Sequence, residues 1–161
     1  GMMAVGKTTL GKIVAKDQQL EFIDTDASIE KNNSMTINEI FEKKGEDFFR
    51  LQEENEVLES LKKNNCIIAL GGGAFMNKNV RNIILENSLS IWLDLNLKTL
   101  NKRIKWNKKR PLLHGKNAQE VMKKLYVERR NIYKLAHHKI NCNNLTKGNI
   151  AKKIIILYEK H

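Results

Sequence analysis

The sequence is poor in cysteine, proline and aromatic residues. Among 161 residues there are two cysteines and one proline, and aromatic residues make up 6%. Cys66 and Cys142 lie far apart with no metal-ligand spacing around either, so we expect two reduced thiols rather than a disulfide scaffold or a zinc site. There is no Pro/Gly-rich linker, internal repeat or low-complexity tail. The sequence therefore predicts a single domain over residues 1–161.

Long hydrophobic runs are also lacking. No apolar stretch approaches the roughly 20 residues that a membrane-spanning helix needs. The first residues do not show the basic and then apolar pattern of a secretory signal. We therefore expect a cytoplasmic protein without a membrane partner, and the content of 41% hydrophobic and 29% charged residues is ordinary for a globular chain.

Negative charge is scarce as well. Lys and Arg number 29 against 18 Asp and Glu, which gives a formal net charge of +11. Such an excess of positive charge fits a protein that binds either a polyanionic macromolecule or small anionic substrates. The lysines are scattered, and no aromatic residues are interleaved with them to stack on bases. We therefore expect no nucleic-acid partner, and a nucleic-acid-binding protein is kept as the alternative from a different class.

Short β-rich apolar runs alternate with longer runs of helical period. Strands are predicted at Leu20–Ile23, Cys66–Leu70, Leu89–Leu95 and His138–Cys142. Helices are predicted at Lys7–Lys16, Thr36–Lys44, Asp47–Asn64, Lys78–Glu86, Leu97–Trp106, Ala118–Leu135 and Lys147–Glu159. The alternation indicates an α/β fold with a parallel sheet covered by helices on both faces.

The first eight residues match a phosphate-binding loop. Gly1–Thr8, GMMAVGKT, fits G-x-x-x-x-G-K-[ST] at every specified position. In such a loop the glycines let backbone N–H groups face an anion, the lysine reaches the β- and γ-phosphates, and the hydroxyl binds Mg²⁺. The sequence therefore predicts a site for ATP and Mg²⁺. Because such a loop normally follows a buried strand, we also expect a central strand upstream of Gly1 that this sequence does not include.

Two carboxylates follow the first predicted strand. Asp24, Thr25 and Asp26 stand at its C-terminal end, where ligands of open α/β sheets bind. One carboxylate could hold Mg²⁺ through water and the other a substrate hydroxyl. An acidic helix N-cap at Asp26 is the structural alternative.

Two further motifs suit an anionic acceptor. GEDFFRLQEE places Arg50 and Glu53 three residues apart on one helical face. An arginine there could bind an anion, although a surface salt bridge would look the same. Gly71–Gly73 directly follow a predicted strand, and three glycines permit a closer backbone approach to a ligand than an ordinary turn needs.

Basic residues mark two more segments. WNKKRPLL, residues 106–113, contains Arg110 and the single proline, which suits a mobile lid that closes over ATP; a solvated basic loop is the alternative. YVERRNIY sets Arg129 and Arg130 on a predicted amphipathic helix, where both could also be merely exposed.

Taken together, GxxxxGKT, DTD, FFRxxE, GGG, RPLL and ERRxxY, in this order and at these distances, resemble the shikimate kinase family over essentially the whole chain. The resemblance implies a P-loop kinase fold of the nucleoside-monophosphate-kinase type, in which three α/β/α layers contain a five-stranded parallel sheet. It also implies a substrate-binding region at about residues 25–60 and a lid at about residues 105–117. The implied activity is transfer of the γ-phosphoryl group of ATP to the 3-hydroxyl of shikimate, a step of chorismate and aromatic amino acid biosynthesis, by a monomer.

The resemblance further implies roles for individual residues. The residues implied to bind ATP are Gly1, Val5, Gly6, Lys7, Thr8, Thr9, Arg103, which packs on adenine in the family, and Arg110. The residues implied to bind shikimate are Asp26, Arg50, Gly71, Gly72, Gly73 and Arg129. Lys7, Asp26 and Arg110 are implied to be catalytic, and Asp26 either orients the attacking hydroxyl or also takes its proton. Thr8, and Asp24 through water, are implied to hold Mg²⁺.

The chain departs from the family pattern inside the phosphate loop. Ala4 and Val5 stand where the family has a glycine and a small polar residue. Phosphate geometry depends on the outer glycine, Gly6 and Lys7–Thr8, so we expect activity to survive. The alternatives are another small-molecule kinase, such as a gluconate kinase, and a non-catalytic relative that binds ATP or shikimate; retention of the charged motif residues argues against the latter.

Overall fold

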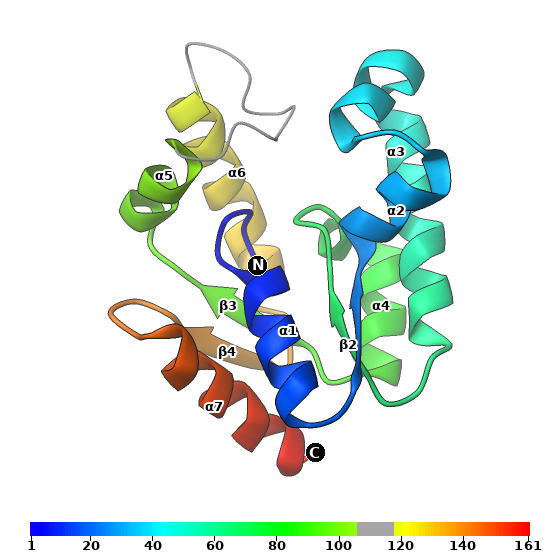
Figure 1. Cartoon of the computed structure of the whole chain (residues 1–161). Helices are drawn as coiled ribbons and strands as arrows, with labels where there is room; N and C mark the ends of the chain where they lie inside the picture. Colours follow the sequence, from blue (N-terminus) through cyan, green and yellow to red (C-terminus); the bar gives the residue numbers. More distant parts are fainter. Residues whose placement is uncertain (106–117) are drawn as a thin grey trace.

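The computed structural model describes residues 1–105 and 118–161 (Figure 1). In chain order its elements are α1 (Lys7–Asp17), β1 (Glu21–Asp24), α2 (Thr25–Asn33), α3 (Ile37–Leu61), β2 (Cys66–Ala69), the 3-10 turn η1 (Ala74–Met76), α4 (Lys78–Asn87), β3 (Ile91–Asp94), α5 (Leu97–Lys105), α6 (Ala118–Tyr133), β4 (His138–Asn141) and α7 (Lys147–Glu159). Each strand predicted from the sequence is present, and the α/β class is confirmed. No helix in the described ranges is long and apolar enough to cross a bilayer.

The strands form two parallel pairs. β1 lies beside β2 with Glu21 opposite Cys66, and β3 lies beside β4 with Ile91 opposite His138. Within the described residues these are two separate two-stranded sheets, so the expected five-stranded sheet is not confirmed. Gly1 lies between β3 and the loop that follows β2. A Cβ added to Gly1 would come 2.7 Å from the backbone oxygen of Leu93 in β3, and a Cβ added to Gly72 would lie 3.9 Å from the Gly1 carbonyl oxygen.

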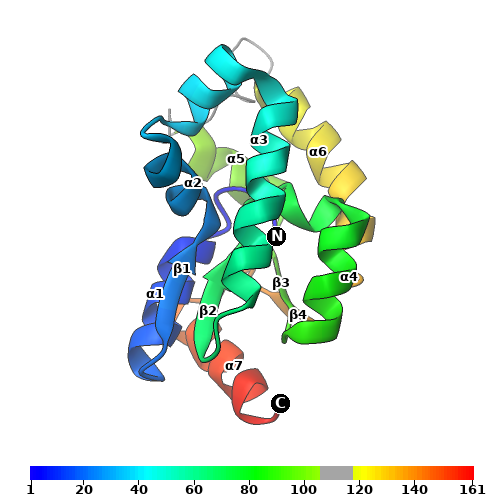
Figure 2. The same ribbon diagram turned by 90° about the vertical axis from the view of Figure 1, so that its right-hand side faces the viewer.

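Helices cover the strands from two sides. α1 packs against β1, β2 and α7, whereas α3 packs against α2 and α4. In Figure 1, α1 and α7 lie in front of the strands and α4 lies behind them, and the turned view of Figure 2 agrees. The main apolar core includes Trp92 and Leu100, and a second cluster of Ile29, Ile40 and Phe49 joins α2 to α3.

The helix α3 contains the two separate helices that the sequence predicted. Gly45 interrupts it with φ 83° and ψ 171°, a conformation that residues with a Cβ rarely adopt. At its start, the Thr36 side chain accepts from the Glu39 backbone and the Glu39 side chain accepts from the Thr36 backbone. This capping box determines where α3 begins.

The helix α2 was not predicted. Its sequence is polar, and the helix is held by the packing of Ile29 in the second apolar cluster rather than by a strong apolar period. Its N-cap is Asp24 and not Asp26, because the Asp24 carboxylate accepts from the backbone N–H groups of Asp26 and Ala27. Asp24 can therefore serve as a cap and still present a second oxygen to a neighbour.

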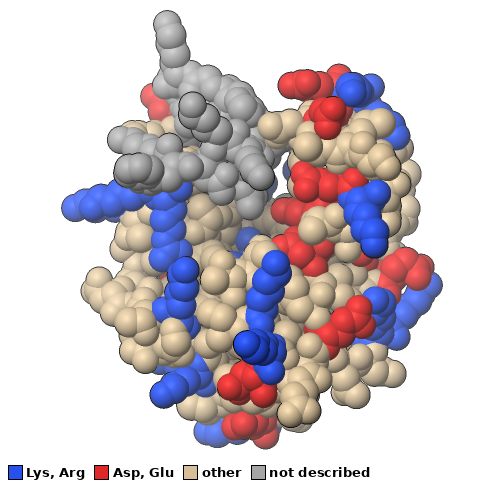
Figure 3. Space-filling model, in the orientation of Figure 1, with Lys and Arg blue, Asp and Glu red and all other residues tan. Residues whose placement is uncertain are grey.

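Charge is unevenly distributed over the surface. α3 contains eight acidic and three basic residues although the whole chain has a net charge of +11. Figure 3 shows acidic side chains gathered over α2 and α3, with many of the basic ones on the opposite part of this face. An arginine on α3 thus lies in acidic surroundings.

Replacement of Gly45 by alanine should lower the free energy of unfolding by about 1–3 kcal/mol, the typical cost of holding such a residue in a glycine conformation. A Cβ at Gly45 would meet no atom within 4 Å, so the effect is conformational and not a clash. Gly148, in the first turn of α7, is the matched control. Because alanine is the better helix former, Gly148→Ala should be neutral or stabilise by up to about 1 kcal/mol. Urea unfolding measures both, and equal effects of the same sign would contradict the prediction.

Candidate active site

The phosphate loop runs into α1 through a glycine in the left-handed region. Gly6 has φ 110°, and Ala4 is also left-handed with φ 61°. The Lys7 ammonium donates to the carbonyl oxygens of Gly1 at 2.9 Å and Met2 at 3.0 Å. The lysine is thus folded back over its own loop, at the N-terminus of α1, which is the kind of position where phosphates bind.

Thr8 and Asp24 form the oxygen pair that the sequence assigned to Mg²⁺. The Thr8 hydroxyl donates to Asp24 Oδ2 at 2.6 Å, while Asp24 Oδ1 caps α2. The described residues contain no group of three or more His, Cys, Asp or Glu that could hold a metal. An all-oxygen pair beside a phosphate loop fits Mg²⁺, which usually takes one or two protein ligands and completes its shell with phosphates and water.

A buried threonine connects the ends of β1 and β2. The Thr25 hydroxyl donates to the Ala69 carbonyl at 3.3 Å and accepts from the Gly71 N–H at 3.0 Å. The side chain of Thr25 is fully buried. This link holds Asp26, the next residue, beside the glycine loop. Sequence reasoning assigned Thr25 no role, although its place between the two aspartates of DTD was the available signal.

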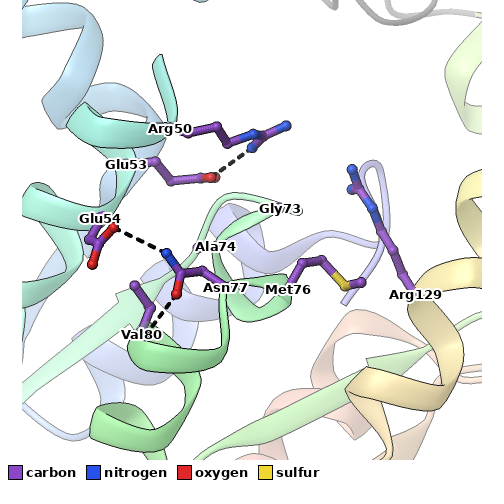
Figure 4. A pocket seen from close by; sticks show the side chains of 9 residues that line it. All are labelled: Arg50, Glu53, Glu54, Gly73, Ala74, Met76, Asn77, Val80 and Arg129. Carbon is purple, nitrogen blue, oxygen red and sulfur yellow. Dashed lines mark hydrogen bonds and ion pairs between the residues drawn. The ribbon is translucent and has the colours of Figure 1, made fainter. Parts of the chain in front are cut away.

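A cavity of about 390 Å³ lies between α3, α6 and the segment that follows β2. Its lining includes Arg50 and Glu53 of α3, Gly73 of the segment after β2, and Arg129 of α6. Figure 4 shows the two guanidinium groups entering the same space from opposite walls. The tertiary structure thus brings together two arginines that are far apart in the sequence.

Arg50 is held by two carboxylates of its own helix. Its Nη1 lies 2.7 Å from Glu53 Oε2 and its Nη2 lies 2.9 Å from Glu46 Oε1. The Glu53 side chain is only 4% exposed, so this is not the surface salt bridge that the sequence left open. Burial raises the pKa of Glu53, and the neighbouring Arg50 opposes that rise. The ion pair orients the guanidinium toward the cavity.

The glycines after β2 allow charged side chains to converge. A Cβ at Gly71 would come 2.5 Å from Glu53 Oε1 and 2.6 Å from Asp26 Oδ1, and one at Gly73 would strike the Arg50 guanidinium. Any side chain at these positions would displace the acidic and basic groups of the site. Gly71 and Gly73 are therefore explained by close packing and not by an ordinary turn.

The carbonyl of Gly72 joins this loop to α6. It accepts from Arg129 Nη1 at 3.0 Å and from the Tyr133 hydroxyl at 2.6 Å. Both side chains are buried, and burial raises the pKa of Tyr133. Sequence reasoning did not place Tyr133 in the site, although it is the last residue of ERRxxY. Arg130 is different, since its side chain is 45% exposed and lies 3.8 Å from Asp94 Oδ2.

The remaining assigned residues fall into three groups. Val5 is buried and Thr9 is exposed in the first turn of α1. Arg103 reaches the phosphate loop from α5 and donates to the carbonyls of Ala4 and Val5. Arg110, and the predicted lid from residue 106 onward, lie outside the described residues.

The phosphate loop and the arginine cavity are neighbours. A Cβ at Gly72 would lie 3.2 Å from Arg129 Nη1 and 3.7 Å from the backbone nitrogen of Met3. Gly72 therefore lies between the phosphate loop and a cavity with two guanidinium groups, and the Asp26 carboxylate lies beside the adjoining Gly71. Such an arrangement can place a phosphoryl donor next to an anionic acceptor with a carboxylate between them.

Comparisons with known proteins agree with this geometry. The family model described as shikimate kinase matches residues 3–159. The chain is 43% identical to the shikimate kinase of Bacillus subtilis, over 96% of this chain and 84% of that protein, and 40% identical to that of Bartonella quintana, over 96% and 74%. The structure of shikimate kinase from Acinetobacter baumannii in complex with shikimate superposes with a TM-score of 0.94 at 32% identity, over 99% of this chain and 90% of that chain. The match to the family model, about 40% identity to curated shikimate kinases over nearly the whole chain and the close structural superposition lead to one conclusion: the chain belongs to the shikimate kinase family.

Proposed function

We propose that the chain transfers the γ-phosphoryl group of ATP to the 3-hydroxyl of shikimate, giving shikimate 3-phosphate and ADP. The observation that carries this proposal is the cavity in which Arg50 and Arg129 face each other beside the phosphate loop. Two guanidinium groups suit the carboxylate of shikimate, because the planar fork of arginine matches carboxylate geometry. Asp26 then meets the hydroxyl groups at the other end of the same molecule.

The chemical step is a direct in-line displacement. The oxygen of the 3-hydroxyl forms a bond to the γ-phosphorus, the bond from that phosphorus to the bridging β,γ-oxygen breaks, and ADP leaves with the electron pair. Asp26 accepts a hydrogen bond from the attacking hydroxyl, orients it and takes its proton. Positioning and neutralisation of charge supply most of the acceleration in such reactions, since the protein does little covalent chemistry.

Binding of the ATP phosphates and of Mg²⁺ depends on Lys7, Thr8 and Asp24. Lys7 exchanges its hydrogen bonds to the Gly1 and Met2 carbonyls for the β- and γ-phosphates when ATP binds. Thr8 and Asp24 would hold Mg²⁺, the first directly and the second through water, and the metal would neutralise charge that develops on the phosphates. Their oxygens are already adjacent, 2.6 Å apart, which supports this assignment.

The complete sheet is part of the proposal. A fifth parallel strand between β2 and β3 would join the two pairs into one sheet. It is supported by the pairing within the described residues, where β2 meets only β1 and β3 meets only β4. It is also supported by the position of Gly1 between the Leu93 backbone and the Gly72 loop. The substrate-binding region, residues 25–60, would then contain α2, most of α3 and Arg50.

The activity itself is tested by coupled ADP release with Mg·ATP in the presence of shikimate, quinate, gluconate or no acceptor. Turnover should appear with shikimate, because the two arginines and Asp26 together fit a hydroxylated carboxylate of that shape. Gluconate is the informative comparison, since it offers the same functional groups on an open chain. Equal turnover with gluconate, or none with shikimate from folded protein, would refute the proposed substrate.

The arginine cavity is tested by Arg50→Ala and Arg50→Lys. Removing the guanidinium should raise KM for shikimate by about ten- to one-hundred-fold, which corresponds to loss of a hydrogen bond to a charged group, with a smaller effect on KM for ATP. Lysine should restore only part of the affinity because it lacks the planar fork. Arg130→Ala is the matched control and should leave both KM values unchanged. A folded Arg50→Ala enzyme with unaltered KM for shikimate would remove Arg50 from the site.

The fifth strand is tested by amide hydrogen exchange in the catalytically active protein. The amides on the facing edges of β2 and β3 should exchange slowly, because the carbonyl groups of a strand between them would accept hydrogen bonds from those amides. The paired amides of β1 serve as the internal reference for a protected strand. Fast exchange along both facing edges, with β1 protected, would contradict the proposed sheet.

A further inference from the structure

Arg103 contacts the backbone of the phosphate loop. Its Nη1 donates to the carbonyl oxygen of Val5 at 2.8 Å and to that of Ala4 at 3.2 Å. A Cβ built on Gly6 would lie 3.9 Å from the same nitrogen, so the guanidinium covers the loop from Ala4 to Gly6. A residue of α5, far away in the sequence, is therefore attached to the loop by two hydrogen bonds.

These two bonds fix the direction of the loop amides. In a trans peptide the carbonyl of one residue and the N–H of the next point in opposite directions, because the unit is planar. Residues 1–105 and 118–161 contain no cis peptide bonds. When Arg103 holds the carbonyls of Ala4 and Val5, the N–H groups of Val5 and Gly6 must point away from it. The N–H groups of Val5 and Gly6 lie directly before the N-terminus of α1. In a phosphate loop, N–H groups at this position face the bound anion.

The loop has a specific need for such support. Ala4 is left-handed with φ 61°, a conformation that costs a residue with a Cβ roughly 1–2 kcal/mol and costs glycine almost nothing. Lys7 holds the carbonyls of Gly1 and Met2, but it has to turn toward the phosphates when ATP binds. The bonds from Arg103 lie on the other part of the loop and can persist in the complex.

We propose that Arg103 is a positioning residue of the phosphate site: by holding the Ala4 and Val5 carbonyls it directs the Val5 and Gly6 amides toward the triphosphate and offsets the strain at Ala4. This role acts through the loop backbone, and it differs from packing on the adenine ring. It rests on the proposed function to the extent that the loop must bind the phosphates of ATP.

A triphosphate ligand that lacks adenine distinguishes positioning of the loop from packing on the adenine ring. Binding of Mg·ATP and of magnesium tripolyphosphate is measured by calorimetry for the wild type and Arg103→Ala. A positioning role predicts that both ligands lose affinity by the same factor, about tenfold, as expected for loss of hydrogen bonds from a charged donor. A contact to adenine alone predicts that ATP binding weakens while tripolyphosphate binding is unchanged, and that result would overturn the inference.

Two variants separate positioning from simple loss of charge. Lys102→Ala removes a cation from the neighbouring residue of α5, which is exposed, and should leave tripolyphosphate affinity within about twofold of the wild type. Ala4→Gly should restore part of the affinity that Arg103→Ala loses, because glycine adopts the left-handed conformation without support. A Lys102→Ala loss as large as that of Arg103→Ala, or no recovery with Ala4→Gly, would overturn the inference.

The same measurements distinguish this inference from the proposed function. Circular dichroism and thermal unfolding check that the variants are folded, which we expect because Arg103 is an exposed residue of α5. A wild type that neither binds tripolyphosphate nor shows shikimate-dependent turnover refutes the function and this inference with it. A wild type that does both, with an Arg103→Ala variant that binds tripolyphosphate equally well, refutes this inference alone.

Discussion

The site depends on a stretch of backbone without side chains, Gly71–Gly73, against which charged groups from three helices are packed. Asp26 and Glu53 approach Gly71, Arg50 approaches Gly73, and the Gly72 carbonyl accepts from Arg129 and Tyr133. No Cβ could be accommodated at Gly71 or Gly73 without moving one of these groups. The close packing lets α3 and α6 present opposite charges to one small cavity, and it holds Asp26 of α2 at the adjoining Gly71. It also puts that cavity beside the phosphate loop.

Charge in the cavity is balanced unequally, and this matters for an incoming anion. The Arg50 guanidinium is compensated by Glu53 and Glu46 at ion-pair distance. Arg129 instead donates to a neutral carbonyl, although the Glu53 carboxylate is close enough to interact with it electrostatically. A carboxylate that enters between them therefore meets one guanidinium held rigidly in place and another whose charge is less fully neutralised. The Arg50 guanidinium fixes the orientation of the carboxylate, and the Arg129 guanidinium supplies more of the electrostatic attraction.

Much of the fold and site could be predicted because the signals are local. The strands, the helical runs on both sides of Gly45 and the phosphate loop follow from periodicity and a specific motif. The helix α2 could not be found this way, since it is polar and is held by Ile29 in a cluster that exists only after folding. Tyr133 and Thr25 were also missed as site residues, because each acts through a hydrogen bond to a residue distant in sequence.

The sequence by itself determined the chemistry that is available: a loop that can bind phosphates, two aspartates after a strand, three adjacent glycines and arginines at recognisable places. It could do so because each of these motifs is defined by residues that are adjacent or close together in the sequence. Only the tertiary structure decided which groups meet. It buried Glu53 against Arg50, made Asp24 and not Asp26 the cap of α2, and brought Arg103 onto the carbonyls of Ala4 and Val5. Those outcomes depend on how helices pack around the strands, which no local pattern encodes.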